Sequence, residues 1–568
     1  MKFLRFMESS RTRNSILDWL IAATLAFAVI SGTAGVDLEL GNLSLRSHSA
    51  IRVLMVAVIL LAVRWRIGIA SVPLWLTRVV LLTAICGSVG TWFRFLVSTI
   101  GGADSYGYVS ASELIARGSL IADAPIAGWL SAANRAAIAS PLGWAPAPDG
   151  AGIVPTYPLG LPMLMALVSA VTGPQAVFFV APLAAALTLW LVNRLARAWY
   201  DADTALFATA LVAWNPLLIT YAKQPMSDVP AAMWMVLALT LAVRSSSKSA
   251  FGAGLAAGAA VLTRPALLIA AAAICFASYR SDTPRRRSAL TVTGLAIGLA
   301  VQMLIQAYLF GSPFSTGYGD ADTLFSVSYL MKNLGIFARQ GWIVLGPLWI
   351  LGLLVGVFAA RPEPRSRPAL IFVAVLLPYL FYLPFDHWET LRFILPGIVP
   401  LTVTVADGLM HFARAPRRHV AAAIMLCAFT AVAVAQSELL LRRSSVWDVA
   451  SMEARYPLAG DWVSVNTPAN AVVLANQHSG SLRWYGKRQT LRWDFIAAED
   501  LTKTVQEIES HGATAYVALE GAEADMFEAR FGNVIGQLQV DHVGRVRNVQ
   551  FRRLTSRGGN PAPGSSSP

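Results

Sequence analysis

Long apolar stretches dominate the first three quarters of the chain and set its expected architecture. Runs of roughly 16 to 24 apolar residues recur, and an α-helix needs about 20 to cross roughly 30 Å of hydrocarbon. We therefore predict a polytopic α-helical membrane protein with about 13 transmembrane helices. The predicted spans cover residues 15–33, 48–63, 74–97, 176–195, 203–221, 229–243, 250–262, 264–279, 289–309, 342–360, 369–384, 393–410 and 419–436.

The pattern changes in the last quarter, where short apolar runs are separated by polar residues. Residues 471–475 and 515–519 predict buried strands, and residues 500–511 have the spacing of an amphipathic helix. We expect a small α/β domain over residues 437–555, outside the membrane. The tail that follows, 556–568, is rich in Gly, Pro and Ser and is expected to be disordered.

Residues 97–175 form a long, only partly apolar loop between two predicted spans. From 106 to 121, small and apolar residues return at helical spacing beside polar ones, which is typical of a helix lying along a membrane surface. Residues 163–171 are apolar but too few to cross a bilayer, and a Thr-Gly-Pro sequence separates them from the next span. This stretch predicts a second interfacial helix.

The distribution of positive charge predicts the orientation. Charged residues make up only 14% of the chain, against about 25% in soluble domains. Lys and Arg concentrate on one set of short loops, which marks the cytoplasmic side. We expect a cytoplasmic N-terminus, with residues 97–175 and the C-terminal domain on the opposite side. The net charge of +13 then follows from topology, and nucleic-acid binding is not expected. The basic set comprises Lys2, Arg5, Arg11, Arg13, Arg64, Arg66, Arg194, Arg197, Arg244, Lys248, Arg280, Arg285, Arg286, Arg287, Arg361, Arg365, Arg367, Arg414, Arg417 and Arg418.

Two acidic residues stand at the predicted outer ends of spans. Asp104 lies in Gly101-Gly-Ala-Asp-Ser-Tyr-Gly-Tyr108, just after a span, and Asp228 lies in Gln224-Pro-Met-Ser-Asp-Val-Pro230, just before another. A carboxylate at such a position is either simply solvated or part of a site. Because both acids fall on the same side of the predicted membrane, they are candidates for one site.

These motifs, taken in order, resemble the GT-C glycosyltransferases. The branch in question holds protein O-mannosyltransferases, aminoarabinose transferases of lipid A and related bacterial enzymes. The resemblance rests on the two acids, the surface helix and the Tyr-Pro-x-Gly-x-Pro entry to a short apolar segment at 157–162. It covers residues 74–410 of a transmembrane domain that we expect over 1–436. At Tyr157, aminoarabinose transferases have a basic residue instead.

The resemblance implies an enzyme that takes a sugar from a polyprenyl-phosphate carrier on the outer membrane face. It implies Asp104 as the catalytic base and Asp228 as the second catalytic acid, in one displacement with inversion. The acceptor hydroxyl would belong to a glycan, a lipid or a protein. The implied location is the bacterial inner membrane, where the lipid bilayer is itself a partner.

The chemistry of the residues agrees with that assignment. Arg392 and Lys223 suit the donor phosphate, because a guanidinium binds phosphate with two parallel hydrogen bonds and an ammonium acts as a point charge. A divalent metal ion shared by Asp104 and Asp228 would do similar work, although no ligand spacing establishes one. The candidate substrate contacts are Tyr108, Tyr157, His387 and Glu389.

Other interpretations of these residues stay open. Arg392 can equally balance Asp386 or Glu389, and Lys223 can extend to the membrane surface. A transporter or flippase of lipid-linked saccharide is the alternative from another class, but it predicts charges in mid-span and two similar halves. A non-catalytic envelope assembly protein that docks through its C-terminal domain is the third possibility.

Overall fold

The computed structural model describes residues 74–150, 152–279, 283–319, 321–359, 362–414 and 419–557. It also describes the antiparallel strands β1 (Val36–Leu40) and β2 (Leu43–Ser47) and isolated positions before residue 64. The predicted spans 15–33 and 48–63 therefore lie largely outside the described residues, as does most of the tail predicted over 556–568.

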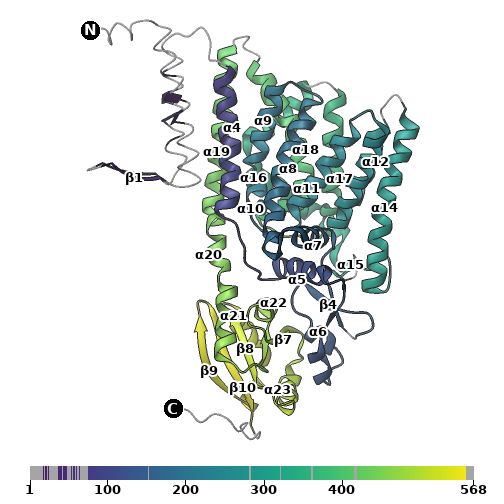
Figure 1. Cartoon of the computed structure of the whole chain (residues 1–568), viewed down its shortest axis with the longest axis vertical. Coiled ribbons are helices and arrows are strands. Elements are labelled where there is room, and N and C mark those ends of the chain that lie inside the picture. Colours follow the sequence, from purple (N-terminus) through teal and green to yellow (C-terminus); the bar gives the residue numbers. More distant parts are fainter. Residues whose placement is uncertain are drawn as a thin grey trace. The chain divides into compact units, whose positions relative to one another are not determined.

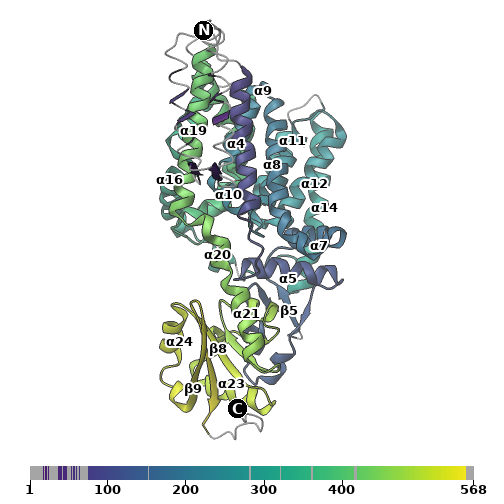
Figure 2. The same cartoon turned by 60° about the vertical axis from the view of Figure 1, so that its left-hand side comes forward.

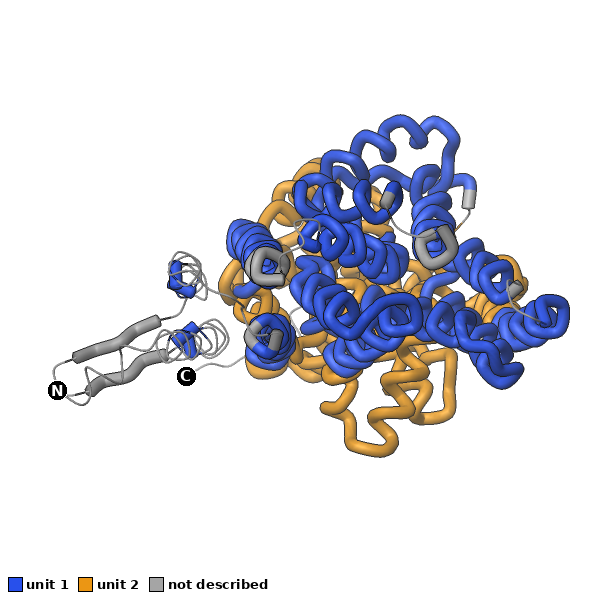
Figure 3. The backbone as a smooth tube through the Cα atoms, turned by 90° about the horizontal axis from the view of Figure 1, so that it is seen from above, with its two compact units in different colours: residues 1–96, 181–299, 321–447 blue, residues 97–180, 300–320, 448–568 orange. Residues whose placement is uncertain are grey.

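The chain divides into two compact units, coloured separately in Figure 3. Unit 1 contains residues 1–96, 181–299 and 321–447. Unit 2 contains residues 97–180, 300–320 and 448–568. Unit 2 thus joins the long loop after the span that begins near residue 74 to the C-terminal segment, although these parts are far apart in sequence.

Unit 1 is built from α-helices, many of which run alongside one another (Figures 1 and 2). Residues 300–310, the last turns of the helix that begins at Pro284, belong to unit 2. The helices are α4 (Leu74–Arg94), α8 (Val180–Arg197), α9 (Ala202–Ala213), α10 (Pro216–Ala222), α11 (Asp228–Ala242), α12 (Ser247–Thr263), α13 (Leu268–Tyr279), α14 (Pro284–Phe310), α15 (Ala321–Leu324), α16 (Leu330–Ala359), α17 (Pro362–Leu380), α18 (Leu395–Arg414) and α19 (His419–Arg443).

The predicted number of spans is not confirmed. Among the described residues, five helical segments are long and apolar enough to cross a membrane, and the bent pair of α9 and α10 would make a sixth. Other predicted spans correspond to shorter apolar helices, such as α11. The helix is interrupted between α9 and α10, where Asn and Pro follow each other in the sequence. Asn215 caps α10 by accepting hydrogen bonds from two backbone N–H groups, and Pro216 begins that helix.

Burial distinguishes the centre of unit 1 from its outer helices. In the most apolar stretch of the segment that contains α18, 89% is buried inside the protein. The corresponding stretches of the segments that contain α14 and α16 are only 28% and 22% buried. Outer helices that expose apolar side chains over most of their surface are expected to face lipid. The helical part of the chain therefore has the character of a membrane protein, with α18 in its core.

The first part of unit 2 contains both helices that were predicted in the long loop. They are α5 (Asp104–Ala116) and α7 (Gly160–Thr172). Met163, Leu167 and Val171 are exposed at a spacing of four along α7, which gives this short helix an apolar stripe. Between the helices lie α6 (Arg135–Ala139) and a small sheet in the order β3-β5-β4, formed by Ala122–Asp123, Gly152–Pro155 and Trp144–Pro146.

The C-terminal part of unit 2 contains a mixed sheet in the order β7-β6-β8-β10-β9. Figure 2 labels its strands β8 and β9. Strand β6 pairs in parallel with β7 and β8, and the β8-β10-β9 pairs are antiparallel. The predicted strands and helix in this region are confirmed. The elements are α20 (Val449–Glu453), α21 (Arg455–Asn466), β6 (Val472–Ala475), α22 (Ser479–Trp484), β7 (Gln489–Leu491), α23 (Leu501–Ser510), β8 (Ala515–Glu520), α24 (Glu523–Phe531), β9 (Leu538–Val546) and β10 (Val549–Ser556).

Helices cover this sheet on both faces. All of β6 and nearly all of β8 are buried, which a strand achieves only when both of its faces are covered. Ala459 and Val463 of α21 and Leu482 of α22 pack on one face. Helix α23 packs against β8 and β10, and α24 packs against β8. The C-terminal segment therefore has a core of its own.

Candidate active site

Asp104 begins α5, where the backbone is packed unusually tightly. A Cβ atom at Gly143 would lie 2.6 Å from the carbonyl oxygen of Ala103, and one at Gly107 would lie 2.6 Å from the Tyr157 ring. Only glycine fits at either position, and Gly143 also has a positive φ of 84°. The carboxylate of Asp104 is half-buried. A negative charge at this end of a helix is stabilised by the helix dipole.

The Tyr157 hydroxyl donates a hydrogen bond to the Asp104 carboxylate. Burial and the nearby carboxylate raise the pKa of Tyr157, so the phenol keeps its proton at neutral pH and remains a donor. The ring centroid of Tyr157 lies 4.9 Å from that of Tyr108 and 6.0 Å from that of Tyr318. Unit 2 therefore brings together three predicted site residues, Asp104, Tyr108 and Tyr157, beside the aromatic ring of Tyr318.

Asp228 begins α11 in unit 1 and is held by an arginine. Arg264 lies between α12 and α13, donates a 2.6 Å hydrogen bond to Oδ1 of Asp228, and contacts the Ser227 hydroxyl at 3.2 Å. Asp228 is 1% exposed and Arg264 is 13% exposed. Oδ2 of Asp228 is buried and has no hydrogen-bond partner among the described residues.

Arg392 lies beside Arg264 around a shared aromatic ring. The guanidinium carbons of Arg264 and Arg392 lie 5.5 and 5.3 Å from the centroid of Phe393. Arg392 also lies over the ring of Tyr221 at 5.5 Å and donates a hydrogen bond to its hydroxyl. Arg264 makes the same kind of hydrogen bond to Tyr379. Two guanidinium groups thus lie in one aromatic environment, which suits them to bind an anion such as phosphate.

Glu389 and His387 lie near this basic cluster. Glu389 belongs to the same 3-10 helix as Arg392 (Trp388–Ile394). The charges of Arg392, Glu389 and Asp228 all interact with the Tyr221 hydroxyl. His387 precedes that helix, and its Nδ1 lies 3.7 Å from Oε2 of Glu389. Both side chains are well exposed. Unit 1 therefore gathers Asp228, Arg392 and Glu389 around Tyr221, and His387 borders the group.

Lys223 has a different environment from the other predicted cation. It is completely buried, and its Nζ donates a hydrogen bond to the carbonyl of Val446. The ammonium lies 5.4 Å from the ring of Trp447 and 6.0 Å from that of Phe95. These contacts give Lys223 a clear structural role. Binding of a phosphate would require the ammonium to leave the Val446 carbonyl.

The donor set does not favour a metal held by these acids. The described part of the chain holds no group of three or more His, Cys, Asp and Glu side chains close enough to share an ion. Arg264 already occupies one oxygen of Asp228 and supplies positive charge there. Divalent cations such as Mg²⁺ prefer several oxygen ligands.

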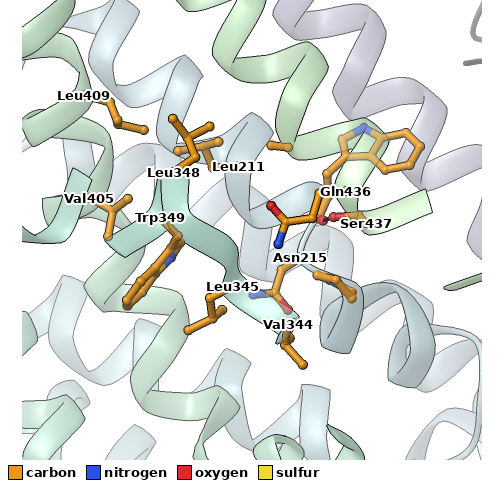
Figure 4. Close-up of a pocket in the computed structure, with 13 residues that line it drawn as sticks. Leu211, Asn215, Val344, Leu345, Leu348, Trp349, Val405, Leu409, Gln436 and Ser437 are labelled. Atoms are coloured by element: carbon orange, nitrogen blue, oxygen red, sulfur yellow. Dashed lines mark hydrogen bonds between the residues drawn. The ribbon is translucent and has the colours of Figure 1, made fainter. Parts of the chain in front are cut away.

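A separate pocket in unit 1 lies where two helices are broken (Figure 4). Trp214 and Asn215, between α9 and α10, line one side, and α16 is kinked at Gly346, where φ is 76°. The Gln436 amide packs against Gly346 and, with Asn215 and Ser437, adds polar groups to a mainly apolar lining. None of the predicted site residues lines this pocket.

Comparison with known proteins identifies the fold. A family model described as dolichyl-phosphate-mannose-protein mannosyltransferase matches residues 156–312. The crystal structure of ArnT from Cupriavidus metallidurans in the apo state is 14% identical, with a TM-score of 0.53, over 84% of this chain and 97% of that one. Bound to undecaprenyl phosphate, ArnT is 12% identical, with a TM-score of 0.54, over 85% and 99% of the two chains. The chain has the GT-C glycosyltransferase fold.

A second GT-C enzyme gives the same result. The crystal structure of the Archaeoglobus fulgidus oligosaccharyltransferase, tethered with an acceptor peptide, is 13% identical, with a TM-score of 0.51, over 83% of this chain and 73% of that one. None of the curated proteins is similar enough in sequence to count as a relative. The resemblance inferred from the sequence is confirmed at the level of the fold, and residues 156–312 also match the mannosyltransferase family model.

Sequence reasoning missed Arg264, the partner of Asp228. The signal was present, since Arg264 interrupts two apolar runs and is followed by Pro265. An ionisable residue between apolar helices is a candidate functional residue by default. The tyrosines at 221 and 379 gave no comparable signal, because aromatic residues are common near the ends of spans.

Proposed function

We propose that this chain transfers a sugar from a polyprenyl-phosphate-linked donor to an acceptor hydroxyl on the extracytoplasmic face of the bacterial inner membrane. The observation that carries the proposal is the Asp104 carboxylate, oriented at a helix N-terminus by the Tyr157 hydroxyl. The undecaprenyl phosphate bound to ArnT supports the choice of a polyprenyl-phosphate-linked donor.

In the proposed reaction, Asp104 accepts the proton of the acceptor hydroxyl. The acceptor oxygen forms a bond to the anomeric carbon while the bond from that carbon to the phosphate oxygen breaks, with inversion. Tyr157 holds the base in place through a hydrogen bond that needs no rearrangement during the reaction. The products are the glycosylated acceptor and the polyprenyl phosphate.

Arg392 and Arg264 stabilise the negative charge that develops on the departing phosphate. Arg392 and Arg264 can each offer two parallel N–H donors to phosphate oxygens. Asp228, the second acid of the site, keeps Arg264 in place and compensates its charge before the donor arrives. Tyr108, His387 and Glu389 are the proposed contacts to the sugar or the acceptor, and Lys223 is a further candidate for the phosphate.

The proposed topology keeps residues 1–436 as the membrane domain, with about 13 crossings if the short and bent helices are counted. Its N-terminus is cytoplasmic, and residues 437–555 form a soluble domain outside the cell membrane. The exposed apolar stripe of α7 supports a position in the membrane interface for that helix.

A deletion strain tests the function. Loss of the enzyme should cause one lipid-linked sugar to accumulate, and that lipid then serves as the donor for the purified protein in detergent. Asp104→Asn should abolish transfer while leaving the thermal unfolding midpoint and the binding of undecaprenyl phosphate unchanged. Asp123→Asn, an exposed acid in the same loop, should have normal transfer. Normal transfer by Asp104→Asn would refute the assignment of the base. EDTA treatment of the same preparation tests for a divalent ion.

A further inference from the structure

The stretch from Ile100 to Tyr106, which carries Asp104, is fastened to the C-terminal segment of the chain (residues 448–557) within unit 2. The backbone N–H of Ile100 donates a 2.9 Å hydrogen bond to the hydroxyl of Tyr485. A Cβ atom at Gly101 would lie 1.9 Å from Cδ2 of Tyr456. The Tyr456 ring therefore lies directly on the backbone of Gly101, and only glycine allows this approach.

The residues that follow Asp104 are fastened in the same way. A Cβ atom at Gly480 would lie 2.3 Å from the Tyr106 ring, so that ring lies on the first turn of α22. The N–H of Leu142 donates a 3.0 Å hydrogen bond to Oγ of Ser479. Leu142 precedes Gly143, which packs against Ala103. The C-terminal segment therefore contacts the chain on both sides of Asp104, at Ile100 and Gly101 and at Tyr106, and it also bonds to Leu142 beside Gly143.

Tyr456 is itself held rigidly. Its hydroxyl accepts a 2.7 Å hydrogen bond from Nε2 of Gln477 and a 3.1 Å hydrogen bond from Arg455. Arg455 forms an ion pair of 2.9 Å with Glu520, whose second oxygen lies 3.0 Å from Nε2 of His478. His478 is completely buried. A ring fixed at both its face and its hydroxyl can transmit the position of the C-terminal sheet to Gly101.

We propose that the C-terminal segment positions the catalytic base, with Tyr456 and Tyr485 as positioning residues for Asp104. This inference rests on the proposed function, because it presumes that the Asp104 carboxylate takes part in transfer. A displacement of about 1 Å in a reacting group can lower the rate on the order of 100-fold. The segment is therefore part of the active site, although neither tyrosine contacts a reacting atom.

Two variants test the proposal by different routes. Gly101→Ala forces the Tyr456 ring away from the backbone, and Tyr485→Phe removes only the acceptor of the Ile100 N–H. Both should raise the hydrogen-exchange rate of amides 100–106, measured by mass spectrometry on the full-length protein in detergent. Both should also lower kcat, for Gly101→Ala on the order of 100-fold. The KM for the lipid-linked sugar isolated from the deletion strain should stay within about threefold, because the phosphate-binding residues are unchanged.

Matched variants separate positioning from general stability. Gly128→Ala makes the same substitution in the same loop, where a Cβ meets no atom within 4 Å, and should behave as wild type. Phe527→Leu shrinks a buried ring of α24 that packs against Trp493 and Phe531, so it should lower the unfolding midpoint while keeping kcat within about threefold of wild type. If kcat followed the unfolding midpoint across all four variants, the role would be purely structural and the proposal would be wrong.

Two further results would overturn the positioning role. Unchanged exchange at residues 100–106 in both Gly101→Ala and Tyr485→Phe would overturn the proposal, as would faster exchange with normal kcat. Asp104→Asn, assayed in parallel, tells which idea has failed. If Asp104→Asn is inactive, only the positioning role is lost, whereas an active Asp104→Asn enzyme removes the proposed function as well.

Discussion

Arg264 and Asp228 form a 2.6 Å ion pair that is almost completely shielded from solvent. A buried pair of this kind is weak evidence for net stability, because both charges lose their hydration. Breaking it is costly, however, because the partner charge then remains buried alone. The pair therefore makes Asp228 important for folding as well as for the proposed chemistry.

Asp228→Asn should lower the free energy of unfolding by about 3 to 5 kcal/mol, because Arg264 would keep a buried and uncompensated charge. Denaturation of the purified protein in detergent measures this loss. Asp386→Asn breaks the exposed ion pair with Arg339 and should cost less than about 1 kcal/mol. Similar losses in the two variants would show that the Arg264 pair is not shielded as described.

Tyr157→Phe should lower kcat by about 10- to 100-fold, the range expected for the loss of a hydrogen bond to a charged group. The ring remains, so its contact with Tyr108 should persist, and the unfolding midpoint should change little. Tyr516→Phe, which removes a hydroxyl from β8, provides the control and should transfer sugar normally. A wild-type kcat in Tyr157→Phe would mean that Asp104 needs no orienting donor.

Substitutions of Arg392 should weaken phosphate binding, whereas substitution of Lys223 should mainly lower stability. Arg392→Gln should weaken binding of undecaprenyl phosphate by about 10- to 100-fold, because a charged hydrogen-bond donor to the phosphate is lost. Arg392→Lys should restore only part of this affinity, since an ammonium lacks the planar fork. Lys223→Met should mainly lower stability, because Lys223 is buried and bonded to the Val446 carbonyl. Calorimetric titration of each folded variant with the lipid separates the cases, and weak binding by folded Lys223→Met would support Lys223 as a phosphate ligand.

The local elements of this protein are readable from its sequence because they depend on short-range patterns. Residues 471–475 and 515–519 were predicted as strands from their apolar runs, and the structure has β6 and β8 there. The two helices of the long loop were found for the same reason. The number of crossings was harder to predict, because a short apolar run has the same composition whether it spans, bends or packs inside the bundle.

The contacts of the site depend on long-range packing, which single-sequence patterns do not record. Asp104 stood out from its place after a span. Tyr157 lies more than 50 positions further on and was predicted as a substrate contact, not as a partner of Asp104. Arg264 and Asp228 are separated by 36 positions and become neighbours because α11 and α12 pack together. The charge distribution placed the long loop and the C-terminal segment on the same side of the membrane, but nothing in the sequence indicated that they form one compact unit.

A pH-dependent prediction follows from Asp201, which lies in the loop before α9. Burial opposes ionisation of this carboxyl, but the guanidinium of Arg414, at 2.9 and 3.1 Å, and the Thr204 N–H outweigh that effect and lower its pKa to about 2. The folded-state pKa lies below the ordinary value of 3.8. The ionised group therefore stabilises the fold above about pH 4, and this contribution is lost as the pH falls toward 2.

Asp201→Asn should consequently flatten the pH dependence of stability between about pH 4 and pH 2, while Asn still caps α9. The side chain is about half exposed, so solvent screening should limit the difference from wild type to about 1 kcal/mol at neutral pH. Unfolding midpoints of wild type and variant, measured from pH 2 to pH 6, provide the test. Arg414→Gln should produce part of the same flattening, because the Thr204 hydrogen bond remains. Equal acid sensitivity in wild type and Asp201→Asn would show that the ion pair with Arg414 does not hold Asp201 ionised in solution.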